Sequence, residues 1–79
     1  MDMMMVAGHD EAIVGVVTRF GQSPVLCYDY KKVIGTLVSG GMSEEEAVEY
    51  FDFNIEGAWV GEGTPCFIVL DDWRRYMEE

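Results

Sequence analysis

Carboxylates are the most abundant chemically active side chains of this sequence, and seven of them fall within residues 43–65, a stretch without Lys, Arg or His. If the stretch is helical, at about 100° per residue, one flank collects a row of four acids. Acids in an exposed row lack the burial that separates the pKa values of a catalytic acid and base. The row therefore favours the binding of a positively charged surface over catalysis. It consists of Glu45, Glu49, Asp52 and Glu56.

Motifs for metal, phosphate or nucleophilic chemistry are incomplete. Residues 52–57 match the opening of an EF-hand loop, but the position of its bidentate Glu is occupied by Gly63. The glycines of residues 57–63 have no preceding strand and no following Lys, both of which a phosphate-binding loop requires. His9 is the only histidine, and it falls in a predicted tail where we expect it to be solvated. The sequence therefore predicts a non-enzymatic protein without a metal or another cofactor.

The acidic row lies on the best helix of the sequence. Ser43 is a good N-cap, and Glu46 completes a capping box three residues later. Gly57 is the expected C-terminal stop. Tyr50 and Phe53 form a further face, which is either a second packing surface or an exposed aromatic patch. The face expected to point into the core contains Ala47, Val48, Phe51, Ile55 and Ala58.

The remaining periodicity predicts an α+β fold. Apolar, β-branched runs predict strands at 11–20, 25–28 and 66–70, with a turn at 21–24. A helix over 30–38, capped by Asp29, would bury Val33, Ile34, Leu37 and Val38 and form an αα-hairpin with the main helix. We therefore expect the order ββααβ, with a three-stranded antiparallel sheet covered on one face by two helices.

Size and charge restrict the class of protein. The 79 residues carry a formal charge of −10 and fit one domain, with 1–10 as a flexible N-terminal tail and 11–79 as a single α+β domain. A chain with this net negative charge is not expected to bind nucleic acid directly or to bind an anionic membrane. No signal peptide or membrane span is expected. Acidity that serves only solubility stays open as an alternative.

The two cysteines, Cys27 and Cys66, both lie in predicted strands. A disulfide between them is geometrically feasible. Two reduced, buried thiols are the expected state in a cytoplasmic protein.

A further pattern runs from Tyr28-Asp29-Tyr30 through residues 41–47 to residues 49–65, E-Y-F-D-F-N-I-E-G-A-W-V-G-E-G-T-P. It resembles small proteins of tailed phages and prophages that share E-x-F-x-F-N-x-x-G-A-x-V-G-E-x-T-P, and it covers about half of the chain. The resemblance implies a phage accessory protein in the host (bacterial) cytoplasm. Small acidic phage proteins of this kind are often inhibitors of host defence, including CRISPR systems and restriction enzymes.

The sequence thus leads to two hypotheses. The first is an inhibitor or modulator that binds a host protein with a basic surface, as a mimic of DNA or RNA. The second is a self-assembling structural module, such as a homodimer, in which Tyr50, Phe53 and Trp59 bury against a second copy. The expected partner-binding residues are Glu45, Glu49, Asp52, Glu56, Tyr50, Phe53, Trp59 and Glu62.

Overall fold

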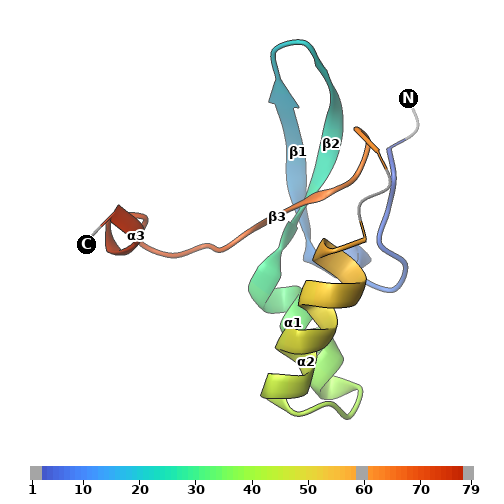
Figure 1. The fold of residues 1–79 in the computed structure, drawn as a ribbon, viewed down its shortest axis with the longest axis vertical. Helices are drawn as coiled ribbons and strands as arrows, with labels where there is room; N and C mark the ends of the chain where they lie inside the picture. Colours follow the sequence, from blue (N-terminus) through green and yellow to red (C-terminus); the bar gives the residue numbers. More distant parts are fainter. Residues whose placement is uncertain (1–2, 59–60, 78–79) are drawn as a thin grey trace.

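The fold was obtained as a computed structural model, which describes residues 3–58 and 61–77. It is α+β with a three-stranded sheet, as predicted (Figure 1). A 3₁₀ turn, η1, precedes the sheet, and a π-helix, η2, extends the second α-helix. The elements in chain order are η1 (Asp10–Ala12), β1 (Ile13–Arg19), β2 (Gln22–Asp29), α1 (Tyr30–Ser39), α2 (Glu44–Tyr50), η2 (Phe51–Glu56), β3 (Cys66–Ile68) and α3 (Arg74–Met77).

Strands β1 and β2 form the predicted hairpin, with a tighter turn than expected. Arg19 pairs with Gln22, so the turn consists of Phe20 and Gly21 alone and the prediction of a turn over 21–24 is wrong. Gly21 has a φ of 77°, a conformation that side chains with a Cβ disfavour. Pro24 lies inside β2, near the start of the strand.

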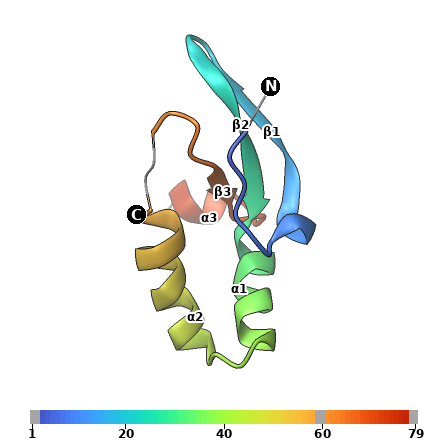
Figure 2. The same cartoon turned by 90° about the vertical axis from the view of Figure 1, so that its right-hand side faces the viewer.

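The prediction of an antiparallel sheet is wrong, because β3 pairs with β2 in parallel. Helices α1 and α2 form a hairpin, so the chain returns to the end of the sheet at which β2 ended. Residues 61–65 lie beside the β-hairpin before the chain turns back into β3 (Figure 2). A crossover of this length, residues 30–65, allows the parallel pairing that a short turn excludes.

The helices extend beyond one end of the hairpin, whereas the sequence predicted that they would cover one face of the sheet (Figures 1 and 2). The cause is local. Helix α1 begins at Tyr30, directly after the last residue of β2, and Asp29 caps it by accepting a hydrogen bond from the Lys31 amide at 3.0 Å. With no linker between them, the helix leaves the sheet at the strand end. Val14 and Val16 of β1 stay exposed as a result.

The core lies at the junction of hairpin and helices. Phe51 is at its centre, with its ring edge-to-face against Tyr30 and against Phe67, both at a centroid distance of 4.8 Å. These contacts join α1, η2 and β3. The fully or nearly fully buried apolar residues are Ala12, Cys27, Tyr28, Val33, Ile34, Ala47 and Phe51.

The main helix begins as predicted. The Ser43 hydroxyl accepts from the Glu46 amide at 3.1 Å, and the Glu46 carboxylate accepts from the Ser43 amide at 2.9 Å. From Phe51 onward it continues as the π-helix η2, which the sequence did not predict, and it ends at Gly57 as expected. A Cβ at Gly57 would lie 2.7 Å from the Asp52 carbonyl oxygen, so only glycine fits there without a backbone shift.

Burial agrees with most of the predicted apolar positions on the two helices. Ala47 and Phe51 are buried and Val48 and Ile55 are half-buried, whereas Ala58, which was expected in the core, is exposed because it follows the end of η2. On α1, Val33 and Ile34 are buried and Leu37 is half-buried. The expectation for Val38 is wrong: it is exposed on the last turn of α1, beyond the reach of the core.

The segment before the sheet contacts the core at two points. The Val6 amide donates a hydrogen bond to the Tyr28 hydroxyl at 2.8 Å. His9 is buried, so the expectation of a solvated histidine is wrong; its backbone makes the turn into η1, donating to the Val6 carbonyl and accepting from the Ala12 amide. The flexibility of residues 1–10 stays a prediction.

Residues 69–77 form an arm that projects away from the body and ends in α3 (Figure 1). We call this segment the C-terminal arm. Within it, Arg75 pairs with Asp71 at 2.9 Å, and Arg74 pairs with Asp72 at 3.2 Å and stacks over the Trp73 ring. The large apolar side chains of the arm are exposed, namely those of Val69, Leu70, Trp73, Tyr76 and Met77.

Candidate functional site: an acidic helical face

The predicted row of acids is an exposed surface on α2 and η2, and the structure adds Glu44 to it. We call this surface the acidic face: Glu44, Glu45, Glu49, Asp52 and Glu56. Glu44, Val48 and Asp52 follow one another at intervals of four residues, a spacing that places them on one side of a helix. The same spacing in the sequence could have identified Glu44.

A shallow groove with a volume of about 390 Å³ runs through this face. Four acids, Val48 and Phe53 line it; the acids are Glu44, Glu45, Glu49 and Asp52. The groove therefore offers a ligand carboxylate oxygens together with apolar contacts from two side chains. Lys and Arg fit such a surface, because their methylene stems cover apolar atoms while their charged ends reach the acids.

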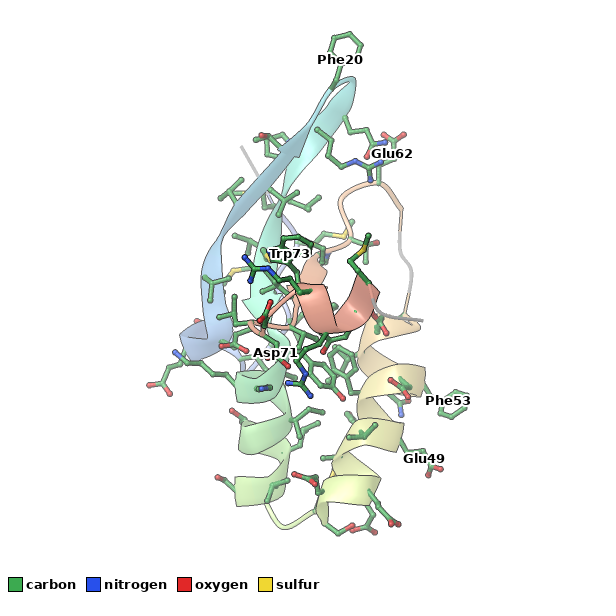
Figure 3. The ribbon with its side chains drawn as sticks, turned by 90° about the vertical axis from the view of Figure 1, so that its left-hand side faces the viewer. Phe20, Glu49, Phe53, Glu62, Asp71 and Trp73 are labelled. Atoms are coloured by element: carbon green, nitrogen blue, oxygen red, sulfur yellow. The ribbon has the colours of Figure 1, made fainter. Side chains whose placement is uncertain are left out.

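Phe53 is the aromatic residue that marks this site. Its side chain is 75% exposed, and it points outward from η2 on the same side as Glu49 (Figure 3). It lines the acidic groove and also a second groove of about 300 Å³, where Tyr50, Glu49 and Met42 contribute to the wall. An exposed ring between two grooves can anchor a partner in the way that interface aromatic residues do.

The acidic face also acts on a side chain of the neighbouring helix. Tyr30 lies at the start of α1 and packs against Phe51. Partial burial and then the negative charges of Asp52, Glu56 and Glu44 raise the pKa of its phenol. Glu44 at the start of the main helix and Asp52 and Glu56 near its end therefore all raise the pKa of the Tyr30 phenol. The sequence did not indicate that Tyr30 belongs to the site.

A third groove, of about 490 Å³, separates α1 from α2 beside the acidic face. Tyr30 and Lys31 line one end of it, and Glu44 and Val48 contribute from α2. Sequence reasoning treated the apolar residues of α1 as core and so missed this opening. Val38, exposed on the last turn of α1, forms part of its wall.

Glu62, one of the predicted partner-binding residues, is not part of this assembly. Glu62 lies in the loop beside the β-hairpin, far from Glu49 and Phe53 (Figure 3). It lines a different opening, together with Arg19 and Cys66. Trp59 lies outside the residues that the structure describes.

No basic side chain neutralises the acidic face within residues 3–58 and 61–77, where both ion pairs belong to the C-terminal arm. In the arm, a hydrogen bond from the Asp72 amide is the main cause that lowers the pKa of Asp71, and Arg75 adds to it. Among the described residues no ion pair of this kind reaches the acidic face. It is a concentrated negative surface with the exposed Phe53 ring at one of its grooves.

No group of three or more His, Cys, Asp or Glu side chains could hold a metal ion among the described residues. None of the described helices is long and apolar enough to cross a membrane. Comparisons of the chain with protein-family models, curated proteins and solved structures give no match.

Proposed function

We propose that this chain is a non-enzymatic phage accessory protein that binds a basic surface of a host protein through its acidic face and Phe53. The host protein would be a nucleic-acid-binding component of a defence system such as CRISPR, and the binding would inhibit or modulate it in the host cytoplasm. The single observation that carries the proposal is the exposed carboxylate row of α2 and η2, unpaired within the described residues, with the exposed Phe53 ring beside it.

Like charges four residues apart on a helix cost about 0.2–0.5 kcal/mol per pair, so this row opposes folding unless a cation neutralises it. Glu45 and Glu49 of α2 are about 6 Å apart along the axis at 1.5 Å per residue. That spacing is comparable to the distance between phosphates in a nucleic-acid strand. A groove of Arg and Lys side chains built for phosphates would accept it.

The test is an affinity pull-down of tagged protein from bacterial lysate treated with nuclease, analysed by quantitative mass spectrometry. We expect a basic, nucleic-acid-handling protein or complex that is retained at moderate salt and released at high salt, because screening weakens charge-dependent association. The same pull-down is repeated with the triple variant Glu45→Gln, Glu49→Gln, Asp52→Asn. This variant should lose the captured protein.

A matched control removes the same amount of charge elsewhere. The variant Asp10→Asn, Glu11→Gln, Glu62→Gln neutralises three exposed carboxylates outside the acidic face. It should capture the partner as the unmodified protein does. Equal loss with both triple variants would show that net charge, not the acidic face, governs binding. Unchanged capture by the acidic-face variant would refute the proposal.

A self-assembling module is the second candidate function, and the structure offers it a different surface from the one that the sequence suggested. Trp73 and Tyr76 of the C-terminal arm are 64% and 65% exposed, and Val14 and Val16 leave one face of the β-hairpin apolar. Residues 12–28 contain no carboxylate, so two copies would meet there without like-charge repulsion. A dimer in which each arm packs on the hairpin of the other copy would cover both surfaces.

The oligomeric state separates the two functions. If the protein self-assembles, its mass in analytical ultracentrifugation should rise with concentration, and the variant Trp73→Ser, Tyr76→Ser should remain a monomer. A monomer mass at every concentration would exclude the second candidate. That result would leave the first one intact.

A further inference from the structure

The two cysteines of the chain, 39 positions apart in the sequence, are direct neighbours in the sheet. Cys27 of β2 is the register partner of Cys66 of β3, and both thiols are free. Residues paired directly across adjacent strands present their side chains on the same face of the sheet, and Cys66 contributes to the raised pKa of the Cys27 thiol, so the two thiols lie close together. The parallel pairing of β2 and β3, which the sequence did not predict, creates this arrangement.

The spacing suits a covalent bond between the two sulfur atoms. Neighbouring strands lie about 4.7–4.9 Å apart. The Cα atoms of a disulfide are usually about 4.4–6.8 Å apart, so directly opposed residues on adjacent strands fall inside this range. The backbone therefore does not need to move far for a disulfide to form.

We propose that Cys27 and Cys66 form a reversible redox pair, which closes into an intrachain disulfide by exchange with a low-molecular-weight disulfide such as oxidised glutathione. In the first step the Cys66 thiolate attacks one sulfur of the oxidant, and one glutathione thiolate leaves. In the second step the Cys27 thiolate attacks the sulfur of Cys66, and the second glutathione leaves. Two protein thiols are oxidised and one glutathione disulfide is reduced, and the two protons released by the cysteines go to the two glutathione thiolates.

Burial sets the order of these steps. Cys66 is half-buried and lines the opening between the hairpin and the loop, beside Arg19 and Glu62. Cys27 is buried. Its burial and the neighbouring Cys66 raise the pKa of the Cys27 thiol to about 11, so that it is a poor nucleophile toward an external oxidant. Cys66 is therefore the residue that meets the oxidant, and Cys27 is the residue that resolves the mixed disulfide.

The bond would act on the shortest strand of the sheet. Strand β3 pairs with β2 over three residues only, and both the loop before it and the C-terminal arm after it depend on that pairing for their position. A covalent link at Cys66 would fix β3 on the sheet in the oxidised protein. In the reduced protein the backbone pairing with β2 and the packing of Phe67 against Phe51 hold β3 in place without a covalent link.

The test is a titration of the reduced, folded protein with mixtures of reduced and oxidised glutathione, quenched with acid and measured by intact mass and free-thiol assay. The expected result is loss of both thiols and of two hydrogen atoms, with no glutathione attached, and a Cys27–Cys66 peptide in a non-reducing digest. The same chain in urea should instead accumulate glutathione adducts, because its cysteines are no longer held together.

Single variants test the assigned order. The variant Cys27→Ser should accumulate one glutathione on Cys66, and the variant Cys66→Ser should react more slowly at its single remaining thiol. Circular dichroism establishes that each variant is folded. Cys66→Ala is a second variant at the less buried of the two positions. The proposal is overturned if the folded protein keeps both thiols under conditions that modify Cys27→Ser. It is equally overturned if the main product is a glutathione adduct or a disulfide-linked dimer.

Discussion

Replacement of Phe51 by alanine should cost this fold a large part of its stability. Phe51 is 1% exposed and touches two aromatic rings edge-to-face, Tyr30 of α1 and Phe67 of β3. Truncation of a buried Phe typically costs about 3–5 kcal/mol, because transfer free energy is lost and a cavity remains. At about 0.05–0.15 kcal/mol per residue, a domain of this length has a total stability of roughly 4–12 kcal/mol. The variant would thus be marginally folded or unfolded.

Phe51→Leu separates the two contributions. Leucine keeps most of the apolar volume but loses both ring contacts, each worth about 0.5–1.5 kcal/mol, so the expected cost is about 1–3 kcal/mol. Phe53→Ala is the matched control, because Phe53 is two residues away in the same π-helix and its ring is exposed. It should change the free energy of unfolding by no more than about 0.5 kcal/mol.

The assay is urea unfolding followed by far-ultraviolet circular dichroism, with the slope of the transition compared between variants to check two-state behaviour. Equal destabilisation by Phe51→Ala and Phe53→Ala would refute the assignment of the two faces of η2. A cost below about 1 kcal/mol for Phe51→Ala would mean that the ring is not the centre of a packed core.

Two further predictions concern the ends of η2 and its charges. Gly57→Ala should destabilise the protein by about 1–3 kcal/mol in the same assay, since the new Cβ would lie 2.7 Å from the Asp52 carbonyl oxygen, and an unchanged midpoint would contradict the close approach. Asp52→Asn with Glu56→Gln should lower the pKa of the Tyr30 phenol, measured by ultraviolet absorbance of phenolate, because it removes two of the charges that raise it. A raised phenol pKa stabilises the folded state fully below the unfolded pKa of about 10, and this contribution is lost as the pH rises through the folded pKa. Between the unfolded and the folded pKa of Tyr30, the variant Asp52→Asn, Glu56→Gln should therefore lose less stability than the unmodified protein. An unshifted phenol titration in this variant would show that the charges of the acidic face do not affect Tyr30.

Local signals in the sequence were sufficient for the two helices. The capping box at Ser43, the cap at Asp29 and the stop at Gly57 depend on neighbours within a few residues, and the structure has all three. The buried positions of Ala47 and Phe51 follow from helical periodicity in the same way. The exposure of the acidic row on the main helix is likewise a consequence of spacing alone.

Features that depend on distant parts of the chain could not be read from the sequence. The direction of β3 depends on the path by which the chain returns from the main helix to the sheet, and the glycines at 57, 61 and 63 leave that path open in the sequence. That path also separates Glu62 from the acidic face. Phe51, the first residue of the π-helix, packs between rings of α1 and β3, and no periodicity signals these contacts. His9 is buried because residues 3–12 fold back onto the sheet end, a contact between segments that share no sequence pattern.

The segregation of charge along the molecule has a consequence for how it approaches other molecules. The tip of the β-hairpin and the helical turn lie at opposite ends of the longest axis (Figure 1). Residues 12–28 carry Arg19 and no acid, whereas the main helix carries six acids. The molecule is therefore an electric dipole, and the field of a basic surface exerts a torque on it. During diffusion the helices turn toward such a surface, so that Phe20 at the hairpin tip faces solvent when contact is made.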